Sequence, residues 1–378
     1  MTNWVAIAKR NHRQLFALLE QLVRIESPTS DREGNNNVAA LLEGHLAQMG
    51  AAVSYDRQAE FGDHLVATWP GKGKHALVIG HIDTVWPVGT LNRMGYTESG
   101  GRIYGPGVHD MKGGIAASIT AFSMLRAANA WPSRPVRFIA NSDEERGSPS
   151  SRALIERYAK GAAYVLVMEP SDGPRGALRL RRKGVGEFRV VIKGKAAHAG
   201  LNPHKGASAV LEMARQIEVM EALSDREAGA NVNVGLVRGG SARNTIPAHA
   251  EALVDVRVPD NTHAARIGDA ILALEPTLPG TRISVKGGFH RPPMDVSPET
   301  ERLYSRVRSA ARDMGFDVPM DRRIFGGGSD ANLTAAMGVP TLDGLGTVGE
   351  NPHAERENIV ADELVNRTAL LARMLSEL

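Results

Sequence analysis

Residues 75–83 read HALVIGHID, an apolar run that ends in a histidine and an aspartate. A short apolar run of this length is typical of a fully buried strand. Further along, the sequence predicts a small-residue helix over 114–128, a strand over 134–140, a helix over 150–160 and a strand over 163–168. Because apolar strands alternate with helices, we expect an α/β sheet that is at least partly parallel and covered by helices on both faces.

Upstream of this region, the sequence predicts two helices and a further strand. Leucines and a valine recur at helical spacing over 4–26 and predict an amphipathic helix. A second helix is expected over 36–49 and a strand over 63–69.

The pattern changes near Gly176. Strands are predicted over 185–195, 231–238, 249–258 and 281–287, with helices over 204–222 and 262–275. This β-α-β-β-α-β order is typical of a ferredoxin-like α+β fold. From about residue 291, the sequence again shows the mixed strand and helix pattern of the first region. We therefore predict a smaller domain, 177–290, inserted into a first domain made of 1–176 and 291–378.

The composition narrows the class of protein. The 378 residues have a net charge of +3 and no dense basic run, which disfavours nucleic-acid binding. Polar and charged residues at 9–13 interrupt the N-terminal apolar segment, and no stretch is long and apolar enough to span a bilayer. We expect a cytoplasmic protein with no membrane partner.

The sequence has no cysteine, so any bound metal must use histidine, aspartate and glutamate.

Two candidate metal-binding motifs lie near the first predicted strands. His81 and Asp83 form a His-x-Asp pair at a strand end, where one ring nitrogen could bind metal while a carboxylate holds the other. A loop histidine beside a surface aspartate would read the same way. Asp110 lies in the glycine-rich run GPGVHDMKGG, 105–114, where the backbone can approach another group closely. This aspartate suits metal bridging, or it caps the following helix.

Three further acidic or histidine positions follow later elements. Glu144 and Glu145 end an apolar strand, where ligand sites of α/β sheets form; a solvated acidic run is the alternative. Glu169 ends the next strand, and His353 lies in a late loop. Each position alone is weak evidence for a metal site. Together they place acidic and histidine residues at the ends of several strands, which would share one edge if the strands are parallel.

These motifs resemble the dinuclear zinc metallopeptidase family of glutamate carboxypeptidases, aminoacylases, acetylornithine deacetylase and succinyl-diaminopimelate desuccinylase, and in particular the carboxypeptidase G type. The resemblance covers nearly the whole chain. It also rests on four further matches, KGKAAHAG at 193–200, SARNTIP at 241–247, DVR at 255–257 and GGGSDAN at 326–332.

The resemblance implies two zinc ions per subunit, although cobalt or manganese suits the same ligands. Asp110 would bridge the ions. His81 and Glu169 would complete the protein shell of one ion, and Glu145 and His353 that of the other. Asp83 would orient His81, and Glu144 would be the general base.

The resemblance also implies roles for the inserted domain as a lid and dimerisation domain. His198 would reach the active site of the partner subunit of a homodimer and stabilise the oxyanion. Arg257 would hold the carboxylate of the substrate, with Asn244 as a nearby polar contact. Gly327 and Gly328 would line the pocket. A surface histidine, a salt-bridged strand arginine, a turn asparagine and a plain glycine turn are the alternatives.

The expected reaction is hydrolysis of an amide bond next to a free carboxylate, releasing a C-terminal amino acid from a dipeptide or an N-acyl or N-aroyl amino acid. The glutamate at position 169 disfavours an aminopeptidase, because the aminopeptidases of this family tend to have aspartate at the matching position. The lysine with which carboxypeptidase G holds glutamate has no match, although Arg175 and Arg179 lie nearby.

Three alternatives stay open to different degrees. An N-acyl amino acid deacylase, such as an acetylornithine deacetylase-like enzyme, would use the same catalytic motifs. A non-catalytic metal-binding homologue should have lost a ligand or the base, whereas all seven positions are present. A nucleotide-binding enzyme is disfavoured, because neither GxGxxG after a strand nor GxxxxGK[ST] occurs.

Overall fold

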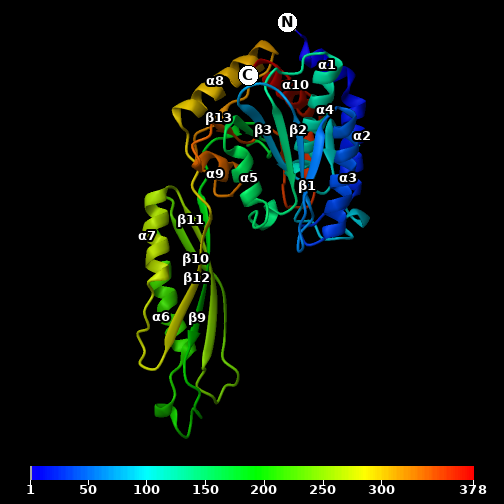
Figure 1. The fold of residues 1–378 in the computed structure, drawn as a ribbon. Coiled ribbons are helices and arrows are strands. Elements are labelled where there is room, and N and C mark those ends of the chain that lie inside the picture. Colours follow the sequence, from blue (N-terminus) through cyan, green and yellow to red (C-terminus); the bar gives the residue numbers. More distant parts are fainter. Residues whose placement is uncertain (1) are drawn as a thin grey trace. The chain divides into compact units, whose positions relative to one another are not determined.

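The computed structural model describes residues 2–378 (Figure 1). The chain forms two compact units. Unit 1 contains the residues up to Arg181 together with Asp295–Arg323 and Ser329–Leu378, and unit 2 contains Arg182–Met294 and Ile324–Gly328. These boundaries fall a few residues after those expected at 177 and 290. The short segment 324–328 also belongs to unit 2, whereas the sequence predicted that it belongs to the first domain.

The main sheet of unit 1 is mixed, with the strand order β1-β2-β6-β3-β7-β14. Its strands are β1 (Ala52–Asp56), β2 (His64–Trp69), β3 (His75–His81), β6 (Val136–Asn141), β7 (Ala162–Val167) and β14 (Thr341–Leu342). β6, β3, β7 and β14 run parallel, whereas β2 is antiparallel to β6 and β1 to β2. Every residue of β3 is buried, as the apolar run predicted. The predicted α/β class is confirmed.

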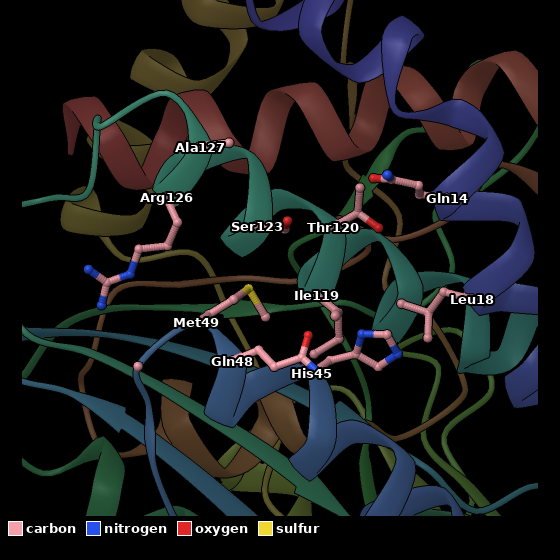
Figure 2. Close-up of a pocket in the computed structure, with 11 residues that line it drawn as sticks. Gln14, Leu18, His45, Gln48, Met49, Ile119, Thr120, Ser123, Arg126 and Ala127 are labelled. Carbon is pink, nitrogen blue, oxygen red and sulfur yellow. The ribbon is translucent and has the colours of Figure 1, made fainter.

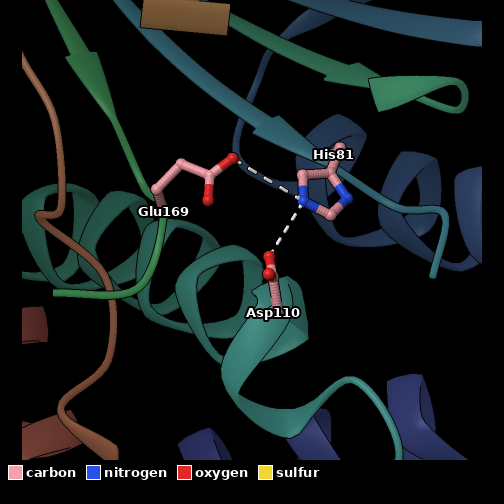
Figure 3. Close-up of side chains that lie close together, drawn as sticks. All are labelled: His81, Asp110 and Glu169. Atoms are coloured by element: carbon pink, nitrogen blue, oxygen red, sulfur yellow. Dashed lines mark hydrogen bonds and ion pairs between the residues drawn. The ribbon is translucent and has the colours of Figure 1, made fainter. Parts of the chain in front are cut away.

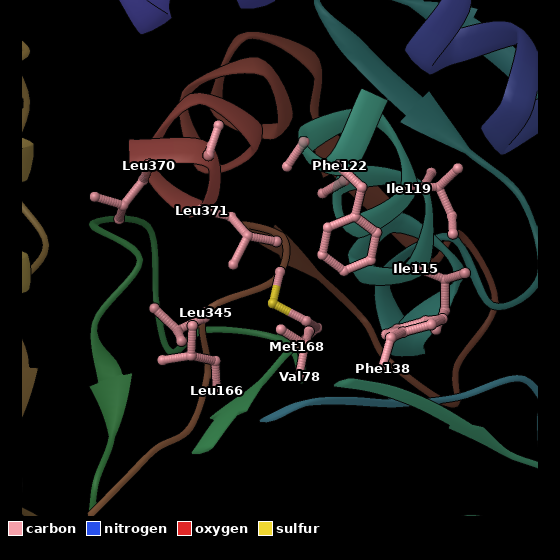
Figure 4. Close-up of a cluster of buried hydrophobic side chains, with 14 of the residues drawn as sticks. Val78, Ile115, Ile119, Phe122, Phe138, Leu166, Met168, Leu345, Leu370 and Leu371 are labelled. Atoms are coloured by element: carbon pink, nitrogen blue, oxygen red, sulfur yellow. The ribbon is translucent and has the colours of Figure 1, made fainter. Parts of the chain in front are cut away.

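Helices flank this sheet. They are α1 (Trp4–Arg10), α2 (His12–Arg24), α3 (Arg32–Gln48), α4 (Gly113–Ala127), α5 (Arg152–Ala159), α8 (Pro298–Asp313), α9 (Asp330–Ala336) and α10 (Ala361–Glu377). The small residues of α4 let it pack tightly, and Phe122 of α4 meets Leu371 of α10 in the core with Val78 and Met168 (Figure 4).

The single helix expected over 4–26 is wrong, because the structure contains two helices that are interrupted at Asn11. The side-chain amide of Asn11 donates a hydrogen bond to the Ile7 carbonyl at 2.8 Å. Asparagine competes with the helical backbone in this way, which favours a helix end.

Short elements complete unit 1. A four-stranded sheet contains β4 (Thr97–Ser99), β5 (Arg102–Tyr104), β15 (Gly349–Glu350) and β16 (Asn358–Val360), and a parallel pair joins β8 (Leu178–Arg179) to β13 (Met320–Asp321). Single turns lie at η1 (Thr90–Asn92), η2 (Val108–Lys112) and η3 (Glu144–Arg146). In the part of the chain that is described, no helix has both the length and the apolar character to cross a membrane.

Unit 2 is a fully antiparallel sheet with the strand order β10-β11-β9-β12. Its elements are β9 (Gly184–Lys193), η4 (Pro203–Lys205), α6 (Ala209–Glu221), β10 (Asn231–Gly239), β11 (His249–Val258), α7 (Asn261–Leu272) and β12 (Arg282–Arg291). The β-α-β-β-α-β order is the one expected. Both helices pack on one face of the sheet, around Phe188, Met213 and Ile267 (Figure 1).

Candidate metal centre

Two groups of histidine and carboxylate side chains gather in unit 1. One contains His81, Asp110 and Glu169 (Figure 3), and the other contains Asp110, Glu145 and His353; within each group the candidate ligand atoms lie within 4.8 Å of one another. Asp110 belongs to both. The structure therefore brings together all five residues that the sequence analysis selected as metal ligands.

The carboxylate of Asp110 turns one oxygen toward each histidine. Its Oδ1 lies 3.2 Å from Nε2 of His81, and its Oδ2 lies 3.2 Å from Nε2 of His353. Glu169 Oε1 is 3.8 Å from Nε2 of His81, and Glu145 Oε1 is 3.2 Å from Nε2 of His353. This is the arrangement in which one carboxylate can be shared between two cations.

The strand ends explain this convergence. His81 is the last residue of β3, Glu169 follows β7, and Glu145 lies in η3 after β6. These three strands are parallel neighbours, so their carboxyl ends lie at one edge of the sheet. Asp110 is held in η2 before α4, and His353 in the loop between β15 and β16.

Glycines let the Asp110 turn pack closely, as the sequence suggested. Gly107 has φ +73°, and a Cβ there would lie 2.7 Å from Thr84 Cγ2. A Cβ at Gly114, the second residue of α4, would lie 2.1 Å from the Met168 carbonyl oxygen. Larger residues at either position would push the turn away from the strand ends.

The electrostatics of the cluster favour cations. Burial by itself lowers the pKa of His81, but the carboxylates of Asp110 and Asp83 outweigh it and raise the pKa well above its ordinary value. Hydrogen bonds to Asp110 and Glu145 raise the pKa of His353 to about 11. Burial likewise raises the pKa of Glu145. Three carboxylates thus face two imidazoles, and a bound divalent cation would offset their excess negative charge.

The donor set fits the metal ions that the resemblance implies. Imidazole nitrogens and carboxylate oxygens are ligands of zinc, and cobalt and manganese accept the same atoms. The fit rests on the arrangement of this chain's own side chains around Asp110.

Asp83 is completely buried and has several partners. Nδ1 of His81 lies 2.9 Å from the backbone oxygen of Asp83 and 3.4 Å from its Oδ1. Thr29 Oγ1 donates to Oδ2 at 2.7 Å, and the N–H groups of Glu144 and Glu145 donate to the same carboxylate at 3.2 Å. Asp83 therefore contacts both His81 and the turn that carries Glu144.

Two buried aspartates that the sequence analysis left without a role also hold this turn. Asp143 accepts hydrogen bonds from the backbone and hydroxyl groups of Ser150 and Ser151. Asp330, at the start of α9, accepts from Ser148 Oγ at 2.5 Å and from the Asn141 amide at 2.9 Å. Asp143 directly precedes Glu144 in the sequence, and Asp330 lies inside GGGSDAN, but neither position indicated these contacts.

The candidate residues of unit 2 fall into two places. His198 is exposed, and its Nδ1 accepts from the N–H groups of Gly200 and Leu201 at 3.2 Å. The Asn244 carbonyl accepts from the N–H of Ala199 at 2.9 Å, so His198 and Asn244 lie on adjoining loops. These loops lie at the end of the sheet where His249 pairs with Lys193.

Arg257 lies at the opposite end, where it pairs with Val185. Its Nε donates to Asp255 at 2.9 and 3.0 Å, and its Nη1 donates to the Gly326 carbonyl at 3.2 Å. The carbonyls of Gly327 and Gly328 accept from Arg182 at 3.1 and 3.2 Å. Eight steps along β11 from His249 to Arg257 span about 26 Å.

A separate cavity of about 770 Å³ opens between α2, α3 and α4 (Figure 2). His45, Thr120 and Arg126 are among its lining residues, and none of the five candidate ligands lines it. We do not assign this cavity to the metal centre.

Comparison with known proteins shows the family of this chain. Residues 77–377 match the family described as Peptidase family M20/M25/M40. The chain belongs to this peptidase family. The resemblance inferred from the motifs is thereby confirmed.

Relatives of this M20 peptidase cover nearly its whole length. Carboxypeptidase G2 from Pseudomonas sp. strain RS-16 is 31% identical, over 95% of this chain and 88% of the relative. Acetylornithine deacetylase from Myxococcus xanthus is 31% identical, over 96% of this chain and 97% of the relative. The crystal structure of aminopeptidase PepT from Bacillus cereus ATCC 10987 has a TM-score of 0.77 at 25% identity, covering 97% of this chain and 98% of that chain. Membership supports a hydrolase but does not by itself select the bond that is cleaved.

Proposed function

We propose that this M20 peptidase is a dinuclear zinc hydrolase that cleaves an amide bond next to a free carboxylate. It would release a C-terminal amino acid from a dipeptide or from an N-acyl or N-aroyl amino acid. The observation that carries the proposal is the carboxylate of Asp110, whose two oxygens each lie 3.2 Å from a different histidine. The carboxypeptidase G2 relative, at 31% identity over 95% of this chain, supports the carboxypeptidase direction.

The proposed ligands are His81 and Glu169 for one ion, Glu145 and His353 for the other, and Asp110 for both. Bound there, the ions would supply an acidified water and a Lewis acid for the amide oxygen. Cobalt or manganese in place of zinc would fit the same atoms.

We assign Glu144 the role of general base. It lies in η3 directly before Glu145, is half-buried, and its backbone is held by Asp83. From this place its carboxylate would accept the proton of the attacking water and then deliver it to the leaving nitrogen. A positioned acid–base group of this kind contributes about 10²–10⁴-fold to turnover.

Arg257 is proposed to hold the carboxylate of the substrate. A guanidinium can bind a carboxylate through two parallel hydrogen bonds, which fixes orientation as well as adding affinity. Here Arg257 already faces the carboxylate of Asp255 and the carbonyl of Gly326. Asp255 would keep the guanidinium in place while its remaining donors meet the substrate, next to Gly327 and Gly328.

We propose that His198, together with Asn244, acts in the active site of a partner subunit. Within unit 2, His198 lies on a loop beyond the His249 end of β11, whereas Arg257 lies near the other end of this strand, which spans about 26 Å between His249 and Arg257. One copy therefore cannot bring both side chains to one small substrate. A second copy would supply the missing histidine, which would stabilise the oxyanion.

Unit 2 also carries a surface that would suit such a homodimer. β10 is an edge strand of its sheet, and Leu236 and Val237 on it are 52% and 50% exposed. On the neighbouring α6, Leu211 is 50% exposed. Edge strands with exposed apolar side chains are natural pairing sites for another chain.

A deacylase is the second candidate, because the acetylornithine deacetylase relative is 31% identical over 96% of this chain. Both reactions cut an amide whose amine side carries the carboxylate. Turnover of dipeptides, N-acyl amino acids and N-aroyl glutamates, compared with zinc supplied, separates the two. A clear preference for N-acetylated amino acids would favour the deacylase.

The Glu144→Gln variant tests the catalytic proposal. It should retain two metal ions and lose about 10²–10⁴-fold in kcat, because the amide cannot accept the proton. Glu156→Gln is the matched control, since Glu156 forms an ion pair with Arg152 on α5 and is not one of the candidate ligands. Near-normal turnover of Glu144→Gln would remove the proposed base.

A further inference from the structure

Glu357 is a buried carboxylate that lies four residues after His353. Its side chain is 0% exposed, and both oxygens accept hydrogen bonds. Oε2 accepts from Trp86 Nε1 at 2.7 Å and from the N–H of Gly107 at 2.9 Å. Oε1 accepts from the N–H of His109 at 2.9 Å and from the N–H of Asp110 at 3.0 Å.

Three of these four donors belong to the turn that carries the proposed bridging ligand. The N–H groups of Gly107, His109 and Asp110 all point at one carboxylate, so the backbone orientation before Asp110 depends on it. Hydrogen bonds to an ionised carboxylate are shorter and stronger than those between neutral groups. Glu357 therefore restrains the peptide from which the Asp110 side chain projects.

The same residue ties that turn to the loop of His353. The backbone carbonyl of Glu357 accepts from the N–H of Gly105 at 3.3 Å, and its own N–H donates to the Ala354 carbonyl at 3.1 Å. Directly after it, β16 pairs with β5, with Asn358 opposite Tyr104. Two ligand-bearing segments distant in sequence are thus joined through one residue.

The His353 loop needs such an anchor. At three residues the backbone of this loop enters the left-handed region, which residues other than glycine rarely adopt. The φ values are +61° at Asn351, +61° at His353 and +68° at Arg356. Conformations of this kind persist only where the surrounding structure holds them. Glu357 comes directly after the last of the three.

We propose that Glu357 is a positioning residue that fixes Asp110 and His353 relative to each other and thereby sets the affinity for both metal ions. This inference rests on the proposed dinuclear function. Groups that orient metal ligands typically change metal affinity 10–100-fold when they are replaced.

The Glu357→Gln variant tests the proposal, because it keeps the size of the side chain but turns an NH₂ group toward N–H donors. The dissociation constants of both ions, measured by calorimetry on the metal-free full chain, should rise about 10–100-fold. Excess zinc should restore most of kcat while KM stays unchanged, because the substrate contacts are elsewhere.

Glu355→Gln is the matched control. Glu355 lies in the same loop, is 79% exposed, and forms an ion pair with Arg93, which is 51% exposed. The same chemical change there should leave both dissociation constants at the wild-type value. Trp86→Phe removes one of the four donors and should give a smaller rise than Glu357→Gln.

Cobalt absorption gives a second readout that a merely structural role would not change. The visible spectrum of the cobalt-loaded protein should differ between wild type and Glu357→Gln but not between wild type and Glu355→Gln. If Glu357→Gln does not fold, unchanged metal constants and spectrum in Trp86→Phe would overturn the inference. Wild-type constants and spectrum in a folded Glu357→Gln would overturn it too, whereas a wild-type chain that binds fewer than two ions would instead refute the proposed function.

Discussion

Unit 1 and unit 2 both carry residues that the sequence assigns to one active site, but they arrange them differently. In unit 1, His81, Glu145 and Glu169 follow three parallel strands, and their side chains meet at one sheet edge. In unit 2, the sheet is antiparallel, and β11 separates Asn244 from Arg257 by its full length. Candidate residues after parallel strands converge within one chain. Candidates that flank an antiparallel strand do not, which is why we propose a second subunit for His198.

The largest expected effect is that of Asp110→Asn, which tests the convergence in unit 1. Both groups share this carboxylate, so removing its charge should weaken the binding of both ions. The loss of affinity should exceed the ~100-fold that is typical when a residue that only orients a metal ligand is replaced. Metal content after desalting measures this. Asp317→Asn is the control, since Asp317 pairs with Arg308 and Arg312 on the surface. Two tightly held ions in Asp110→Asn would show that the groups do not share a ligand.

The second prediction tests the separation in unit 2. His198→Ala should lose about 10²–10³-fold in kcat as an oxyanion donor is removed. Mixing it with Glu144→Gln, after dissociation and reassociation of subunits, should restore activity. In a random mixture half the dimers are mixed, and each has one intact site, which gives about a quarter of wild-type activity.

No recovery in that mixture, with subunit exchange verified by mass, would place His198 outside the partner's active site. Each variant mixed with wild type gives the reference for exchange. The experiment thus distinguishes a shared site from two defects within one subunit.

The third and smallest effect concerns the other end of β11. Arg257→Ala should raise KM for substrates with a free carboxylate about 10–100-fold, because a charge-assisted hydrogen bond contributes roughly 1.5–3 kcal/mol. Arg189→Ala is the control, since Arg189 pairs with Glu251 on the same sheet. If the wild type had equal KM values for free-acid and amidated substrates, Arg257 would not hold the carboxylate of the substrate.

Much of the fold could be predicted from residue patterns. The buried strand β3 and the strand β11 were expected from apolar runs and alternation, and β11 occupies the range predicted. The break at Asn11 was missed because apolar residues recur at helical spacing over 4–26, and the hydrogen bond from the Asn11 side chain to the Ile7 carbonyl has no signal in that spacing. Segment 324–328 was missed because its membership of unit 2 depends on tertiary contacts.

The candidate site shows the same limit. Its proposed ligands stood out because they follow strands or glycine-rich turns. Asp330 and Glu357 did not, since each acts on backbone or hydroxyl groups far away in sequence: Ser148 is 182 residues from Asp330, and Asp110 is 247 residues from Glu357. Buried acids that hold a turn have no local signature, so only the structure identifies them.

Diffraction at the zinc absorption edge, from crystals of the zinc-loaded protein, tests the shared carboxylate most directly. We expect two anomalous peaks roughly 3.5–4 Å apart, as in other two-metal sites, with one oxygen of Asp110 bound to each. One peak should also be ligated by His81 and Glu169, and the other by Glu145 and His353. A single peak, or two peaks in separate pockets with Asp110 bound to neither, would contradict this expectation.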